Sequence, residues 1–118
     1  MNDDKLKGRT KDFALRAIRL VEALPNTRTA DVIGKQLLRS GTSVGANYRA
    51  ACRAKSQADF IAKMGIVEEE ADESLYWMEL LIEAGLVKQQ RLADLMNEAS
   101  QIVAMTVSSI KTARQHKK

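Results

Sequence analysis

Apolar residues recur every three or four positions along almost the whole chain, and runs that strictly alternate apolar with polar residues are missing. The first spacing is typical of amphipathic helices, whereas alternation would be expected of strands. The pattern therefore predicts an all-α protein. Four helices are expected, at about residues 11–24, 29–54, 57–84 and 88–112.

Residues that favour helix ends separate these segments. Pro25 ends the first helix because proline cannot continue the hydrogen-bond ladder. Thr29 with Asp31 favours a helix start, and the run Ser56–Asp59 resembles a capping box that opens the third helix. Gly85 is typical of a C-terminal cap. The connections predicted between the helices are consequently short.

Four helices with short connections predict an antiparallel up-down-up-down four-helix bundle. A chain of 118 residues corresponds to a single domain, residues 1–118. Its ordered core is expected at about residues 11–112, between a polar N-terminal segment and a basic C-terminal tail.

The middle of the second helix, residues 40–45, is poor in helix formers and is compatible with a loop, a kink or a tightly packed helix. A helical wheel at about 100° per residue distinguishes them. Five basic side chains fall within about 40° of one direction, opposite the apolar side chains, on both sides of this segment. They are Arg28, Lys35, Arg39, Arg49 and Arg53. A loop would have broken this phase, so a continuous helix is predicted, with Gly41 and Gly45 allowing close approach of another helix.

The third helix is apolar on two faces, whereas a monomeric bundle needs only one per helix. The second face carries Ile66, Tyr76, Trp77 and Leu80. This surplus favours a subunit interface, where aromatic residues are enriched. The alternative is that Trp77 and Leu80 contact a neighbouring helix of the same chain.

Composition limits the compartment and the chemistry. Cys52 is the single cysteine, which excludes an internal disulfide and fits the reducing cytoplasm. The first twelve residues are hydrophilic, so no signal peptide is expected, and no apolar run is long enough to span a membrane.

Charge is distributed unevenly along the chain. Residues 1–55 hold twelve basic and five acidic side chains, whereas residues 56–118 hold seven basic and ten acidic ones. The five basic residues of the second helix would form a stripe about 38 Å long, which is suited to phosphates of RNA or DNA. One alternative is that acidic residues of the third helix, in the same chain or a neighbouring subunit, neutralise part of the stripe. Another is that the stripe is plain solvated surface. Arg39, Arg49 and Lys63 on one side, with Glu69 and Glu73 on the other, are the expected ion-pair residues.

The sequence contains no combination of residues that is typical of a catalytic site. The acidic cluster at residues 68–73 has no histidine in any helix core beside it, as bundle di-iron sites require. Cys52 lacks a histidine base, and no phosphate-binding glycine loop is present. We therefore expect no enzyme, no metal and no cofactor.

Two runs resemble a known family. The run Gln36–Arg49 and the later run from Phe60 to Leu81 are similar to those of bacterial four-helix-bundle proteins encoded in ribosomal-RNA intervening sequences. The resemblance covers about residues 12–112 and implies a ring-shaped homopentamer. The accessory protein of diversity-generating retroelements is a more distant relative, thought to bind nucleic acid through a positive surface. We therefore expect a cytoplasmic, oligomeric scaffold that binds nucleic acid or a nucleoprotein weakly, or alternatively a purely structural ring.

Overall fold

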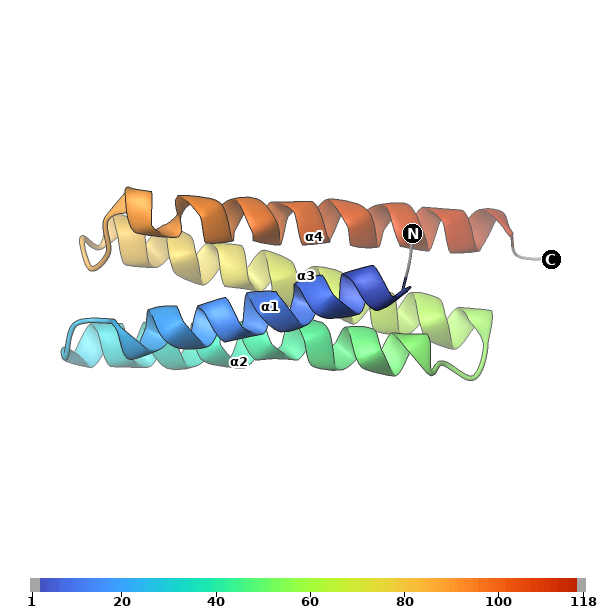
Figure 1. Ribbon diagram of the computed structural model, residues 1–118, viewed down its shortest axis with the longest axis horizontal. Coiled ribbons are helices and arrows are strands. Elements are labelled where there is room, and N and C mark those ends of the chain that lie inside the picture. Colours follow the sequence, from blue (N-terminus) through green and yellow to red (C-terminus); the bar gives the residue numbers. More distant parts are fainter. Residues whose placement is uncertain (1–2, 117–118) are drawn as a thin grey trace.

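Four α-helices account for most of residues 3–116, the part of the chain that the computed structural model describes (Figure 1). They are α1 (Asp3–Glu22), α2 (Arg28–Cys52), α3 (Gln57–Glu83) and α4 (Gln89–Gln115), and no strand occurs in this range. Successive helices run in opposite directions along a molecule of 52 × 21 × 20 Å. The predicted all-α, up-and-down bundle is confirmed.

The helices pack in chain order around the bundle. α2 and α3 share the most extensive contact, α1 packs on α2, and α4 packs on α3. The fourth side of the bundle differs, because α1 and α4 approach each other over only a few residues. α1 is therefore held mainly by α2.

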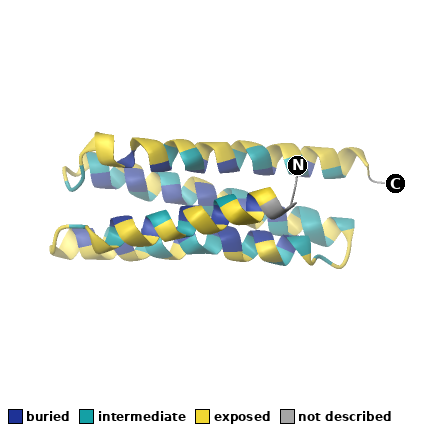
Figure 2. Cartoon of the chain, in the orientation of Figure 1, coloured by how far each residue is buried: buried dark blue, intermediate teal, exposed yellow. Residues whose placement is uncertain are grey.

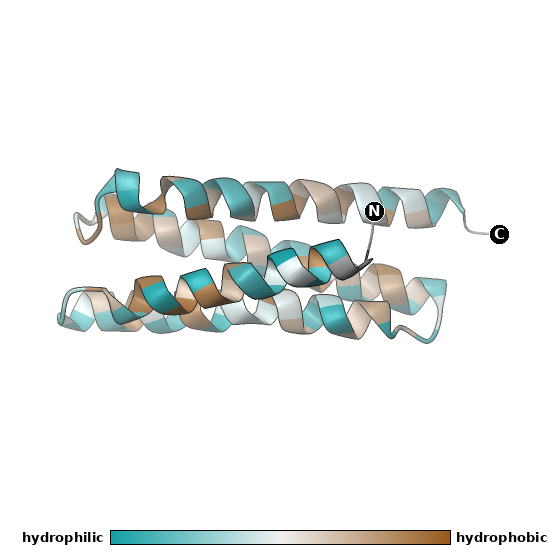
Figure 3. Cartoon of the chain, in the orientation of Figure 1, coloured by the Kyte–Doolittle hydropathy of each residue, from teal (hydrophilic) through white to brown (hydrophobic). Residues whose placement is uncertain are grey.

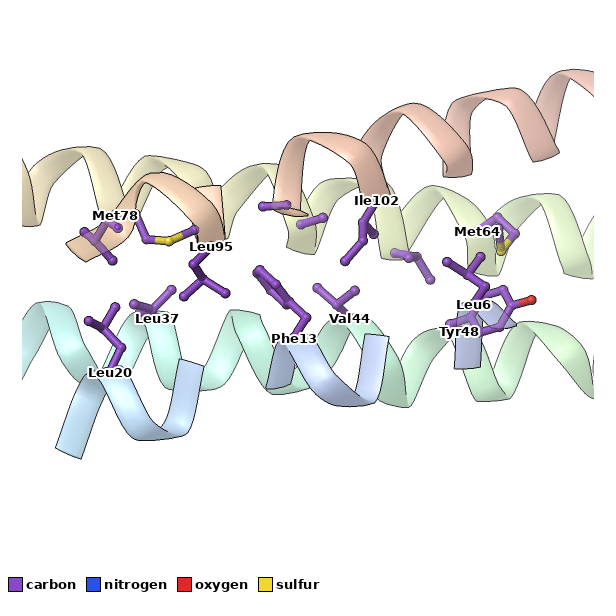
Figure 4. Close-up of a cluster of buried hydrophobic side chains, with 14 of the residues drawn as sticks. Leu6, Phe13, Leu20, Leu37, Val44, Tyr48, Met64, Met78, Leu95 and Ile102 are labelled. Carbon is purple, nitrogen blue, oxygen red and sulfur yellow. The ribbon is translucent and has the colours of Figure 1, made fainter. Parts of the chain in front are cut away.

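The core runs along the whole bundle and is contributed by all four helices. Figure 4 shows it as successive groups, with Phe13, Val44 and Ile102 near the middle and with Leu6 and Met64 near one end. These five side chains are at most 1% exposed. The buried positions in Figure 2 and the hydrophobic positions in Figure 3 lie mainly on the sides of the helices that face one another. The observed packing is what the apolar spacing predicts.

The predicted start of the first helix was wrong. α1 begins at Asp3, eight residues before the expected Lys11, so the segment predicted to be polar and outside the core is helical. Leu6 and Thr10 are both 1% exposed and continue the apolar side of α1. Their signal is weak in the sequence because charged residues surround a single large apolar one. The basic tail also differs, since α4 continues to Gln115.

The second helix starts one residue earlier than predicted and does not use the predicted cap. Thr27, not Thr29, is the N-cap, and its hydroxyl accepts a hydrogen bond from the Ala30 N–H at 3.2 Å. α2 then continues without interruption through residues 40–45, as the phase of its charges predicted. Ser56 caps α3 as expected, accepting from the Asp59 N–H at 3.0 Å.

Small residues bring α1 and α2 together. A β-carbon added to Gly41 would lie 2.9 Å from the β-carbon of Ala17, and one added to Gly45 would lie 3.3 Å from the carbonyl oxygen of Thr10. Both distances are too short for an ordinary contact. The close approach predicted at Gly41 and Gly45 is therefore confirmed, and α1 is the helix that uses it.

Candidate nucleic-acid interface

The basic stripe of α2 lies on the outside of the bundle. All five of its side chains are exposed, from Arg28 at the start of the helix to Arg53 at its C-cap. Their alignment follows from the helical period, which places residues 28, 35 and 53 within about 20° of one another and opposite the core. The predicted position of the stripe is therefore correct, but its members differ in their partners.

Arg39 is engaged in an ion-pair network with α3. Its guanidinium donates to Glu70 Oε1 at 3.1 Å and also to Glu73 Oε2. Trp77 Nε1 donates to the same Glu73 oxygen at 2.9 Å. The Trp77 hydrogen bond and then the Arg39 cation hold the pKa of the Glu73 carboxyl below its ordinary value, against the opposing effect of burial. The predicted pairing of Arg39 with Glu73 is present.

Arg49 was expected to pair with acidic residues of α3, either in the same chain or in a neighbouring subunit, and the first of these pairings does not occur. Arg49 is exposed and forms no ion pair within the described chain. It is separated from Arg39 by ten residues, which corresponds to about 80° around the helix. Arg39 consequently leans toward α3, whereas Arg49 leans toward α1 and lies at a groove beside Lys7 and Lys11.

The remaining stripe cations have weak partners or none. Lys35 Nζ lies 3.2 Å from Asp31 Oδ2, but both side chains are largely exposed, and such pairs add little stability. Arg28 and Arg53 form no ion pair with any described residue. Three of the five stripe cations, Arg28, Arg49 and Arg53, therefore face solvent uncompensated.

The other predicted ion-pair residues meet different partners. Lys63 Nζ pairs with Asp59 Oδ1 at 2.5 Å, one turn earlier on α3, and not with the acidic cluster. This pair and the backbone N–H of Lys55 hold the pKa of Asp59 below its ordinary value. Glu69 is exposed and pairs with no described cation of its own chain, so its ion pair stays a prediction for a contact between subunits.

Sequence reasoning missed one inter-helix ion pair. Arg9 of α1 binds Glu98 of α4 through two hydrogen bonds, Nε to Oε2 at 2.9 Å and Nη2 to Oε1 at 2.7 Å. Arg9 Nη2 also donates to Gln101 Oε1 at 2.8 Å. Because the first helix was expected to begin after Arg9, nothing indicated that this residue faces α4.

The second apolar face of α3 divides into exposed and half-buried parts. Ile66 is 40% and Tyr76 is 52% exposed. Trp77 is half-buried against the core and meets the Tyr76 ring edge-to-face, with centroids 5.0 Å apart. Leu80 is half-buried as well. Packing within the chain, the alternative left open above, therefore accounts for much of the burial of the Trp77 side chain. The side chains of Ile66 and Tyr76 remain exposed.

The described residues contain no group of three or more His, Cys, Asp or Glu side chains placed to hold a metal ion. Cys52 is half-buried and packs against the core. No helix among residues 3–116 is long and apolar enough to cross a membrane. The features that stand out on the surface are thus charge and exposed apolar side chains.

Comparison with known proteins adds a family and a solved structure. A family model described as 23S rRNA-intervening sequence protein matches residues 3–108. A crystal structure of a protein of unknown function from the S23 ribosomal protein family of Bacteroides thetaiotaomicron is 40% identical in sequence. The match covers 94% of this chain and 99% of that chain, with a TM-score of 0.88. A search of curated proteins found no match.

Proposed function

Because the chain belongs to the family of 23S rRNA-intervening sequence proteins, we propose that it is a non-enzymatic, self-associating scaffold of the cytoplasm that binds nucleic acid weakly through charge. The observation that carries this proposal is the exposed stripe of α2, in which Arg28, Arg49 and Arg53 have no ion pair in the described chain. Cations that face solvent without a partner are available to neutralise phosphates.

Self-association is supported by the outer face of α3. Ile66 and Tyr76 are among the large apolar side chains left exposed, and such side chains are enriched where subunits meet. The resemblance described above makes a homopentamer the leading assembly. In a ring, each weak contact with one nucleic-acid strand would be repeated, and the contacts would reinforce one another through avidity.

A purely structural ring that binds no nucleic acid is the alternative. The pairing of Arg39 with Glu70 and Glu73 favours it, because this stripe residue is already engaged within the chain. In this alternative Arg28, Arg49 and Arg53 would pair with acidic residues of a neighbouring subunit or stay solvated.

Assembly is tested by absolute mass from light scattering during size-exclusion chromatography. A mass near five times 13.1 kDa is expected. Replacement of Ile66 and Tyr76 by serine should reduce this mass, whereas replacement of the exposed Val32 of α2 should not. A wild-type mass of a single chain would exclude both self-association and the avidity argument.

Binding is tested by titrating duplex DNA and single-stranded RNA at several salt concentrations. The logarithm of the binding constant should fall linearly with the logarithm of the salt concentration. The double variant R28E/R53E should lose binding while it keeps the wild-type mass. K88E/R91E makes the same change of charge at exposed positions near the start of α4 and should retain binding. No wild-type binding at about 50 mM salt, where phosphate contacts are strong, would overturn the proposal.

A further inference from the structure

We propose that the groove between α1 and α2 seats a stretch of nucleic-acid backbone, with Lys7, Lys11 and Arg49 contacting successive phosphates. This inference rests on the function proposed above and specifies the surface that the nucleic acid would occupy. The groove has a volume of about 520 Å³ and is lined by residues of both helices. It lies beside the stripe of α2, and Arg49 belongs to both.

The shape of the groove follows from the small residues along the helix contact. Gly45 allows α2 to approach the Thr10 backbone, since an added β-carbon would lie only 3.3 Å from the Thr10 carbonyl oxygen. Ala14 and Ala46 also line the groove and leave it open. The long basic side chains of Lys7, Lys11 and Arg49 therefore border a depression with a small-residue floor.

The residues that line this groove in the described part of the chain carry positive charge only. Three other surface hollows that contain basic residues also contain carboxylates. The first contains Glu68, the second contains Glu22 and Asp31, and the third contains Asp94. Among the residues whose side chains are described, the α1–α2 groove is lined by three cations and no carboxylate. None of the three forms an ion pair in the described chain, unlike Arg9 and Arg39. A concave surface lined by one sign of charge concentrates counter-ions of the opposite sign.

The distribution of the cations favours a linear polyanion over a compact anion. Lys7 and Lys11 are separated by four residues, about 6 Å along α1, and Arg49 lines the same groove from α2. Cations that extend along a groove match a chain of phosphates, whereas a single small anion would require them to converge.

The polar groups of the groove also indicate contact with phosphates only. The Thr10 hydroxyl donates to the Lys7 carbonyl at 3.2 Å, and the Thr42 hydroxyl donates to the Leu38 carbonyl at 2.7 Å. Neither hydroxyl proton is then available to a base edge. No aromatic residue lines the groove, so stacking of bases, the usual means of holding single strands, is absent there. Binding should therefore be insensitive to sequence.

The test compares two triple variants that each remove two lysines and one arginine. K7Q/K11Q/R49Q removes the groove cations, and K88Q/R91Q/K111Q removes exposed cations at positions on or next to α4. Binding to duplex DNA and to single-stranded RNA is titrated against salt. The groove variant should bind at least about tenfold more weakly at about 50 mM salt, with a salt slope smaller by about three. The α4 variant should differ little from wild type.

A second pair of variants distinguishes weaker binding caused by charge in the groove from weaker binding caused by loss of the fold. A46E places a carboxylate in the groove, and A104E places one on the exposed side of α4. Only A46E should weaken binding, with circular dichroism and melting temperature unchanged in both.

The outcomes of these experiments distinguish failure of the groove proposal from failure of the proposed function. Binding that R28E/R53E abolishes but K7Q/K11Q/R49Q leaves intact would overturn the groove and keep the proposed function. An absence of wild-type binding would overturn both. Binding of polyglutamate in place of DNA and RNA, lost in the groove variant, would instead assign the groove to an acidic protein and overturn a nucleic-acid ligand.

Discussion

Ser40 of α2 and Ser74 of α3 meet inside the core, with their hydroxyl oxygens 2.9 Å apart and both side chains fully buried. The Ser74 hydroxyl also lies 2.9 Å from the Glu70 carbonyl. Ser40 is the donor between the two hydroxyls when Ser74 donates to Glu70, and Ser74 is the donor when Ser40 donates to the Leu37 carbonyl. This hydrogen bond links the two helices that pack most extensively on each other.

Removal of either hydroxyl should have a limited effect because each serine has a carbonyl of its own helix to bond. Ser40 lies 3.4 Å from the Leu37 carbonyl. We expect S40A and S74A each to lower the free energy of unfolding by about 1 kcal/mol. Since they share one bond, the double variant should cost about 0.5 kcal/mol less than the sum. Urea denaturation measures all three, and S100A at an exposed position of α4 is the control. Strict additivity would show that the bond contributes nothing.

The same glycine-to-alanine change should have opposite effects at two helical positions. At Gly41 the new methyl would lie 2.9 Å from the Ala17 β-carbon, which cannot rotate away, so α1 must shift. We expect G41A to destabilise the protein by about 1–3 kcal/mol. At Gly65 nothing lies within 4 Å, and G65A should stabilise α3 by about 0.5–1 kcal/mol.

Thermal and urea denaturation of the two variants, at equal protein concentration, check this prediction. Equal effects of one sign would mean that helix propensity, and not the α1–α2 contact, determines the outcome at Gly41.

The helical wheel of α2 predicted where its cations lie but not which residues they meet. It places Arg39 and Arg49 on one outward stripe, and both are indeed exposed. It does not say which helix lies on each side of the stripe, and that arrangement decides their partners. Arg39 meets carboxylates because α3 lies on its side, whereas Arg49 meets Lys7 and Lys11 because α1 lies on the other.

The apolar pattern gave the number and order of the helices but failed at the N-terminus. Leu6 and Thr10 are buried, yet one leucine among charged residues does not stand out in a periodicity search. The missed helical turns include Arg9, so the link between α1 and α4 was missed with them. Similarly, the two apolar faces predicted for α3 did not show that the Trp77 side chain packs against the core of its own chain.

Arg9 should contribute more to stability than a typical surface cation. It forms two hydrogen bonds to Glu98 between α1 and α4, which are the neighbouring helices that pack least on each other, and its side chain is 27% exposed. Paired, bidentate contacts of this kind exceed ordinary surface ion pairs. We expect R9M to cost about 1 kcal/mol and to speed hydrogen exchange at the start of α1.

The control for this prediction is R16M. Arg16 pairs only with Asp12 on its own helix, at 3.9 Å, so R16M should cost less than about 0.5 kcal/mol. A double-mutant cycle of R9M with E98Q isolates the pair. If R9M costs as much when Glu98 is already replaced, the contribution comes from packing and not from the ion pair.

Glu73 should make the stability of the protein sensitive to acid. Its pKa in the fold lies below the ordinary value of 4.5, first because Trp77 Nε1 donates to it and then because Arg39 does. The unfolded chain therefore binds the proton at higher pH than the folded chain. The stabilisation is complete above about pH 4.5 and is lost as the pH falls through the folded-state pKa. E73Q should be less stable than wild type at neutral pH, and this difference should shrink as the pH falls below about 4.5 and through the folded-state pKa.

The Trp77 contribution can be separated from that of Arg39 by W77F, which removes the N–H donor and keeps an aromatic ring. The pKa of Glu73, followed by the NMR shift of its carboxyl carbon, should then rise toward 4.5. E69Q is the control, because Glu69 lies exposed on α3 without a described partner. It should follow the wild-type stability curve from neutral to acid pH. A difference between wild type and E73Q that does not shrink at any pH below about 4.5 at which the protein stays folded would mean that the carboxylate charge is not what the Trp77 and Arg39 contacts stabilise.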